Sequence, residues 1–244
     1  ELAAHGGADL LADPAARAQG RIQVMLALTE ARGVQTLAIS DENMIGSVRG
    51  NLRAQSLYPS IGERMARFAR AFDGKISRVV LCTRSLELYW SSSCAFGVAR
   101  GCGVPSDFDL QRIARSRRGW REVITDLACA IPGVEIRVIP FETAMGRPDA
   151  LARLAIGIDA PTDTQRQWLN RGPDLPGLRR VLADRGNGHA QLPYGMGRWN
   201  PFAPDQTAAL REVYEDDIMW LAAGADGMAR LAEDRSRTRA GTTL

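Results

Sequence analysis

Short apolar runs alternate with amphipathic stretches over residues 14–142 of the chain. Ile76–Cys82 is a short apolar run, and Val134–Phe141 alternates apolar and polar positions before it ends at Glu142. Both patterns are typical of strands in a sheet. Val34–Ile39 predicts a further buried strand, which ends at Ser40-Asp41-Glu42-Asn43. Because helix, strand and turn follow one another in this order, we expect an α/β fold with a parallel sheet and right-handed crossovers.

Capped and amphipathic segments predict the helices. Ser85 is the expected N-cap of a helix that follows the strand Ile76–Cys82 and ends near Arg100. Residues 184–204 are rich in glycine and proline and predict a loop. The other expected helices run from Asp13-Pro14 to Ala31, over Ile61–Phe72, within residues 107–130 and 147–183, over Pro204–Ala223 and over about 225–234.

A length of 244 residues fits one large globular domain or two small ones, and 45% of the residues are hydrophobic and 24% are charged. We expect a single domain over residues 1–244. Within it we expect a parallel-sheet core at about 14–142, a helical and loop-rich cap at 143–235 and a frayed tail at 236–244. No apolar run reaches the length of a membrane span, so we expect a cytoplasmic protein without a membrane partner. The four cysteines lack the paired spacing of a zinc site, and we expect no metal.

The net charge of +3 is compatible with an anionic ligand but does not identify one. Nearly all positive charge is arginine, because Lys75 is the only lysine. Arginines recur along residues 112–121, where they form either a solvated, ion-paired helix face or a surface for an anionic acceptor. The first interpretation is preferred. No recognised motif accompanies the arginines, so we do not expect a nucleic-acid partner.

An arginine and a serine are the main candidates for ligand binding. Arg84 follows the strand Ile76–Cys82, and open α/β sheets bind ligands at this end of their strands. Ser92 lies about two helical turns further on, so its hydroxyl and the guanidinium of Arg84 could converge on one phosphate. The alternative is that Arg84 pairs with a carboxylate and Ser92 only packs on its helix.

Taken together, several stretches resemble the PAPS-dependent sulfotransferases, in particular their bacterial members. Arg84 and Ser92 are similar to the Arg-x7-Ser element of that family, and Gly197-Arg198-Trp199 is similar to its carboxyl-terminal Gly-x-Trp loop. Arg185-Gly186 stands where the family has an Arg-Lys-Gly phosphate clamp, and Ser40–Asn43 resembles the end of a substrate-side strand. The resemblance covers about residues 34–235. It implies a P-loop-type three-layer fold, in which helices flank a parallel sheet.

This resemblance implies transfer of a sulfuryl group from PAPS to a hydroxyl or amine of a small-molecule or glycan acceptor, with adenosine 3′,5′-bisphosphate as the product and no metal. Arg84 and Ser92 would hold the 3′-phosphate of the donor. Arg185, Gly186 and Arg198 would close over the donor, and Trp199 would pack against their loop or the adenine. The alternative is a non-catalytic nucleotide-binding homologue.

Glu42 is the expected general base, because partial burial at a strand end would raise its pKa. Asp41 is the alternative, since side chains alternate along a strand and one of the two acidic residues points inward. His189, in a Gly-Asn-Gly-His loop, ranks below both. A further interpretation is that Asp41 caps the next helix and Glu42 pairs with an arginine.

Residues 1–13 do not resemble the family's P-loop, in which backbone N–H groups cradle the 5′-phosphosulfate. Two explanations are open. A strand and P-loop precede Glu1, or the protein is a homologue in which the loop has degenerated. The absence of a methionine at Glu1 favours the first explanation.

Overall fold

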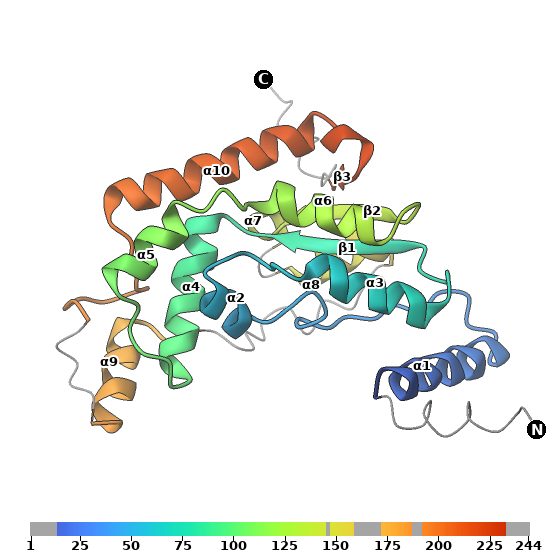
Figure 1. Cartoon of the computed structure of the whole chain (residues 1–244), viewed down its shortest axis with the longest axis horizontal. Helices are drawn as coiled ribbons and strands as arrows, with labels where there is room; N and C mark the ends of the chain where they lie inside the picture. Colours follow the sequence, from blue (N-terminus) through green and yellow to red (C-terminus); the bar gives the residue numbers. More distant parts are fainter. Residues whose placement is uncertain (1–13, 145–146, 159–171, 187–191, 233–244) are drawn as a thin grey trace, which may run out of the picture.

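The computed structural model describes residues 14–144, 147–158, 172–186 and 192–232 (Figure 1). Its centre is a parallel sheet in the order β1-β2-β3, made of β1 (Arg78–Thr83), β2 (Glu135–Pro140) and β3 (Arg230–Leu231). Thr83 pairs with Pro140, so β1 and β2 end side by side at one edge of the sheet. The residues that follow the two strands therefore meet at this carboxyl edge.

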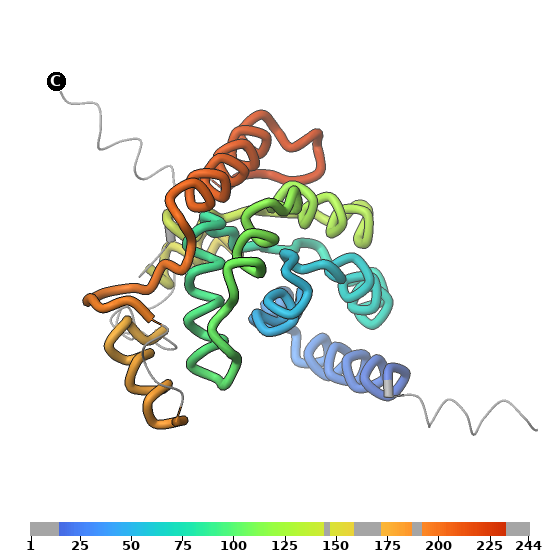
Figure 2. Tube along the Cα trace, turned by 60° about the vertical axis from the view of Figure 1, so that its left-hand side comes forward, coloured from blue at the N-terminus to red at the C-terminus, as the bar shows by residue number. Residues whose placement is uncertain are grey.

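Helices surround this small sheet, and the two views agree on their arrangement (Figures 1 and 2). The longest, α10, packs against α4, α5 and α6, while α4 leads away from the carboxyl end of β1 and packs against α9. The helices are α1 (Pro14–Ala31), α2 (Val48–Ala54), α3 (Ile61–Phe72), α4 (Leu86–Ala99), α5 (Asp107–Ala114), α6 (Trp120–Ala130), α7 (Phe141–Ala144), α8 (Pro148–Ile156), α9 (Leu175–Asp184) and α10 (Pro204–Ala222).

One hydrophobic core joins the sheet to these helices. Val138 of β2, Trp90 of α4 and Val123 of α6 are almost fully buried in it. Removing such side chains from water is the main favourable term in folding, at about 25 cal/mol per Å² of apolar surface. The core therefore fixes β1, β2 and α4 relative to one another, and with them the carboxyl edge.

The predicted α/β class and the parallel sheet are confirmed. The strands predicted at Ile76–Cys82 and Val134–Phe141 form as β1 and β2, with bounds shifted by one or two residues. The strand predicted at Val34–Ile39 is wrong. Residues 34–40 pair with no strand of the described chain, and Leu37 and Ile39 are 50% and 52% exposed. A strand is stabilised by a neighbour as well as by its own apolar pattern, and here the described residues offer no neighbour.

The helix predicted at about 225–234 is also wrong. A short 3₁₀ turn, Ala225–Gly227, occupies its start, and β3 follows at Arg230–Leu231. Gly224 and Gly227 both have positive φ, which interrupts a helix at this point. We predicted a three-layer fold with helices on both faces of a parallel sheet. Within the described residues the sheet has three strands, and the three-layer fold is not established. Expectations for residues 1–13, Pro161 and 236–244 lie outside the described residues.

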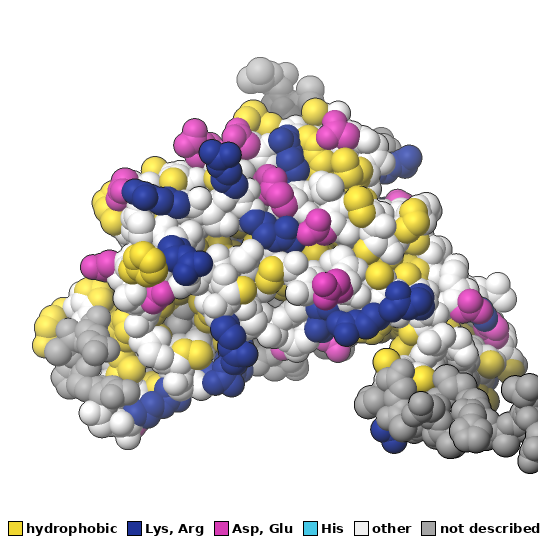
Figure 3. Space-filling model, in the orientation of Figure 1, with side chains coloured by type: hydrophobic (Ala, Val, Ile, Leu, Met, Phe, Trp, Pro, Cys, Tyr) yellow, Lys and Arg dark blue, Asp and Glu magenta, His cyan; other side chains and the backbone are white. Residues whose placement is uncertain are grey.

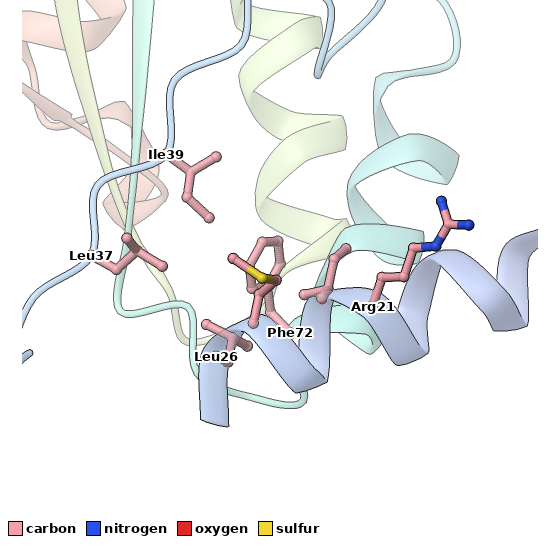
Figure 4. A pocket seen from close by; sticks show the side chains of 7 residues that line it. Arg21, Leu26, Leu37, Ile39 and Phe72 are labelled. Atoms are coloured by element: carbon pink, nitrogen blue, oxygen red, sulfur yellow. The ribbon is translucent and has the colours of Figure 1, made fainter. Parts of the chain in front are cut away.

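An apolar hollow of about 180 Å³ lies between α1, residues 37–39 and α3 (Figure 4). Leu26, Leu37, Ile39 and Phe72 line it, with Arg21 at one end. Much of this surface is open to solvent, since Met25 of α1 is 62% exposed. It is separate in sequence from the residues that follow β1 and β2.

A buried carboxylate attaches α10 to α6. Asp217 of α10 is 5% exposed, and its Oδ2 accepts a hydrogen bond of 2.6 Å from the backbone N–H of Trp120. Gly119 lies so close that a side chain there would collide with this carboxylate. Burial raises the pKa of Asp217 to about 6, although the N–H groups of Trp120 and Arg121 act in the opposite direction.

We therefore expect Asp217 to contribute stability that increases as the pH falls from about 7 to about 4.5. The folded state binds the proton of Asp217 more tightly than the unfolded chain does, so protonation favours folding. This contribution is about 2 kcal/mol. Urea unfolding at several pH values would measure it, and Asp217→Asn should remove the slope because asparagine does not ionise. An identical slope in both proteins would contradict the expectation.

Candidate functional site

The carboxyl edge of the sheet brings together residues that follow two different strands. Arg84 follows β1, and Phe141 and Glu142 follow β2. The guanidinium of Arg84 lies over the ring of Phe141, 5.1 Å from its centroid. This is the geometry of a cation–π contact, which holds the arginine at the edge without neutralising its charge. Ser85 begins α4 immediately beside this pair.

Arg84 has unsatisfied hydrogen-bonding capacity. Its Nε is buried and has no hydrogen-bond partner, and Arg84 makes no ion pair within the described residues. Burial lowers the pKa of Arg84, and the positive charge of Arg198 lowers it further, whereas Glu142 and Glu87 raise it. The positive charge of Arg198 therefore acts on Arg84 from a distant part of the sequence. Such an arrangement favours an anionic ligand, which would relieve the repulsion.

Two carboxylates complete the edge. Glu142 Oε1 accepts a hydrogen bond of 3.0 Å from the backbone N–H of Ser85, and its Oε2 accepts one of 3.2 Å from the hydroxyl of Tyr214. Glu87 is buried, accepts from the Ser85 hydroxyl and pairs with Arg211 of α10 at 3.3 Å. The carboxylates are therefore held by α4 and α10, and α10 supplies two side chains to the site.

Tyr214 stays protonated over the physiological pH range. Burial raises the pKa of its hydroxyl, and the negative charge of Glu142 raises it further. The hydroxyl therefore acts as a hydrogen-bond donor toward Glu142. This contact fixes the orientation of the carboxylate relative to Ser85.

The structure does not join Ser92 to Arg84. Ser92 is exposed on α4, and no hydrogen bond links it to Arg84 within the described residues. Its neighbour Ser91 is buried instead and donates to Asn200 Oδ1 at 3.1 Å. This contact attaches the loop before α10 to α4, which brings that loop to the site.

The loop before α10 places Arg198 and Trp199 in different environments. Arg198 is exposed, and its positive charge acts on Arg84. Trp199 is 5% exposed and belongs to the hydrophobic core together with Phe202. A packing role for Trp199 against its own loop agrees with this burial, whereas the described contacts give it no open face for an adenine ring.

Arg185 lies at the wrong end of α4 for the predicted clamp. Its two terminal nitrogens donate to the carbonyl oxygens of Val98 and Ala99, each at 2.7 Å. These carbonyls end α4, which is 14 residues long, so they lie about 20 Å from its first turn and from Arg84. Gly186 has a φ of 73° and ends α9. Arg185 satisfies the carbonyls of a helix end, and the structure does not bring it to Arg84.

The expected general bases are not held at a strand end. Asp41 and Glu42 lie in an exposed loop, because the strand predicted before them does not form. Asp41 Oδ1 accepts a hydrogen bond of 2.6 Å from the N–H of Asn43, which is a local turn contact. The charge of Glu42 contributes to the raised pKa of Tyr58, so this carboxylate does lie near the aromatic cluster of Tyr58 and Trp120. His189 lies outside the described residues.

The arginines of residues 112–121 do not form the predicted solvated helix face, because α5 ends at Ala114 and α6 begins only at Trp120. Arg118 donates to the carbonyls of Leu57 and Tyr58, at 2.6 and 2.9 Å, and pairs with Asp126 at 2.7 Å. Arg121 lies over the ring of Trp220. Positive and negative side chains are interspersed over the face shown in Figure 3. The described part of this face is therefore not uniformly basic.

Sequence analysis did not assign a role at the site to Glu142, Glu87 or Arg211. Glu142 could have been found, because it follows its strand just as Arg84 follows the neighbouring one. Arg211 carried no such signal, since its place depends on how α10 packs. Comparisons with protein-family models, with curated proteins and with solved structures found no match.

Within the described residues, no group of three or more His, Cys, Asp and Glu side chains is placed to hold a metal ion. In the same part of the chain, every helix is too short or too polar to cross a membrane. The described site is therefore made of arginines, carboxylates and a tyrosine.

Proposed function

We propose that this chain is a sulfotransferase-like protein that holds a phosphate of the sulfuryl donor PAPS at the carboxyl edge of its sheet. The observation that carries the proposal is the buried Nε of Arg84, which has no hydrogen-bond partner among the described residues and also feels the positive charge of Arg198. The orphaned Nε fits an anionic ligand, because a phosphate oxygen would supply the missing acceptor. The resemblance of the Arg84 region to the family's 3′-phosphate element adds support.

In this proposal Arg84 binds the phosphate with its planar guanidinium while Phe141 keeps that group in place. Arg198 adds a second positive charge from the loop that Ser91 and Asn200 attach to α4. The first turn of α4, which Ser85 does not cap with its side chain, favours negative charge at the start of that helix. Ser92 would join the site only if its side chain turned toward the ligand.

PAPS would supply the sulfuryl group, and the protein would position it against the acceptor hydroxyl or amine. The proposal includes a P-loop-type three-layer fold, of which the three described strands would be a part. Glu42, Asp41 and His189 stay the proposed bases for the acceptor proton. A small molecule or a glycan is the proposed acceptor.

A non-catalytic nucleotide-binding protein is the second candidate. The observation that favours it is the exposed loop position of Asp41 and Glu42, which gives neither carboxylate the burial expected of a general base. Such a protein would bind the nucleotide through Arg84 and Arg198 but would not transfer a sulfuryl group. Release of adenosine 3′,5′-bisphosphate from PAPS in the presence of acceptor separates the two candidates.

We expect adenosine 3′,5′-bisphosphate to stabilise the protein against thermal unfolding. A ligand at a hundred times its dissociation constant stabilises the folded state by about 2.7 kcal/mol. Adenosine 5′-monophosphate is the matched control, because it lacks the 3′-phosphate and should stabilise much less. Differential scanning fluorimetry over a range of ligand concentrations would measure both. Equal stabilisation by the two nucleotides, or none by either, would contradict the proposed function.

A further inference from the structure

Glu142 occupies a position that an anionic ligand of this site would need. Its Oε1 accepts from the N–H of Ser85, the residue that begins α4. A phosphate held by Arg84, the residue before Ser85, would approach the same N–H group. The carboxylate and the phosphate therefore require the same donor, and both are anions.

The negative charge of Glu142 also acts on Arg84. It raises the pKa of Arg84, whereas the positive charge of Arg198 lowers it. Glu87 does so as well, but Glu87 is buried and paired with Arg211. Glu142 is exposed and makes no ion pair in the part of the chain that the structure describes. Its hydrogen bonds go to two neutral donors, Ser85 N–H and Tyr214 O–H, which water can replace. Of the two carboxylates, Glu142 is thus the one that can leave.

We infer that Glu142 is an internal competitor of the ligand and sets how tightly the site holds an anion. In the free protein its carboxylate occupies the N–H of Ser85 and offsets part of the charge of Arg84. A phosphate of sufficient charge displaces it from the Ser85 N–H, while the hydroxyl of Tyr214 can continue to donate to the carboxylate. This inference rests on the proposed function, because it takes Arg84 as the ligand's anchor.

The test is Glu142→Gln, because glutamine keeps one carbonyl oxygen that can accept from the Ser85 N–H, and its amide can donate to the Tyr214 hydroxyl oxygen, but it carries no charge. We expect this variant to bind adenosine 3′,5′-bisphosphate about fivefold more tightly than the wild type, as expected for removing one unit charge at about 4 Å in water. Glu122→Gln is the matched control. Glu122 accepts from the N–H of Gly119 at the start of α6, at 2.7 Å, so its loss removes the same charge from another helix start. Its dissociation constant should stay within about twofold of the wild type.

Calorimetry with two probes, the bisphosphate and inorganic phosphate, separates the outcomes. Tighter anion binding in Glu142→Gln, but not in Glu122→Gln, supports the inference. Unchanged or weaker anion binding in Glu142→Gln overturns it, because Glu142 then does not compete with the ligand. Tighter phosphate binding without any preference for the bisphosphate supports the role of Glu142 but contradicts the proposed nucleotide. If neither probe binds the wild type or the variant, both proposals fail. Thermal unfolding of each variant without ligand shows that it is folded.

Discussion

Arg84→Ala is expected to weaken the binding of adenosine 3′,5′-bisphosphate by about 100-fold or more. A bidentate guanidinium–phosphate contact contains two charge-assisted hydrogen bonds, each contributing about 1.5–3 kcal/mol. Arg84 is held for this contact by the ring of Phe141, and its buried Nε has no hydrogen-bond partner to lose in the described part of the chain. The free energy of unfolding should therefore change little while affinity falls. Isothermal titration calorimetry measures the loss.

Two further variants make this result specific. Arg100 also lies over an aromatic ring, that of Phe96 at 3.7 Å, but at the opposite end of α4. Arg100→Ala removes the same charge and should leave the dissociation constant within about twofold. Arg84→Lys keeps the positive charge but lacks the planar guanidinium. Its affinity for the bisphosphate should lie between that of Arg84→Ala and that of the wild type. Equal affinity of Arg84→Ala and the wild type would remove the basis of the proposed site.

The local patterns along the chain predicted the parts of the fold that local chemistry decides. The helix Pro14–Ala31 begins at a proline, and Ile61–Phe72 ends at Asp73-Gly74, as residues at helix boundaries indicate. β1 and β2 form where apolar runs were recognised, and their parallel pairing explains why Arg84 and Glu142 meet. These features depend on few residues each, so a single sequence can reveal them.

Other features depend on partners that no local pattern names. Val34–Ile39 has the composition of a strand, yet pairing is what makes a strand, and this segment has none in the described chain. Arg185 matches a phosphate clamp in spacing, but the end of α4 provides two carbonyls that bind it instead. Trp199 matches a ligand-binding loop and is buried in the core. In each case the tertiary neighbours decide the role of the residue, and they are distant in sequence.

The indole of Trp120 connects the stability of the core to the position of Arg84, and its replacement is the second large effect that we expect. Trp120 is 2% exposed, packs 6.0 Å from the rings of both Tyr58 and Tyr89, and donates from Nε1 to the carbonyl of Arg84 at 2.7 Å. Trp120→Ala should lower the free energy of unfolding by about 3–5 kcal/mol, as large-to-small changes in cores do. Urea unfolding measures this loss.

Trp120→Phe isolates the hydrogen bond from the packing. Phenylalanine keeps an aromatic ring against Tyr58 and Tyr89 but leaves the Arg84 carbonyl without its donor, at a cost of about 1–3 kcal/mol. Because that carbonyl belongs to the residue that binds the phosphate, the affinity for adenosine 3′,5′-bisphosphate should also fall several-fold. Trp90→Phe is the control, since Trp90 is equally buried but no hydrogen bond joins it to Arg84 in the described part of the chain. If both variants lose stability while neither loses affinity, the indole of Trp120 supports the core alone and does not position Arg84.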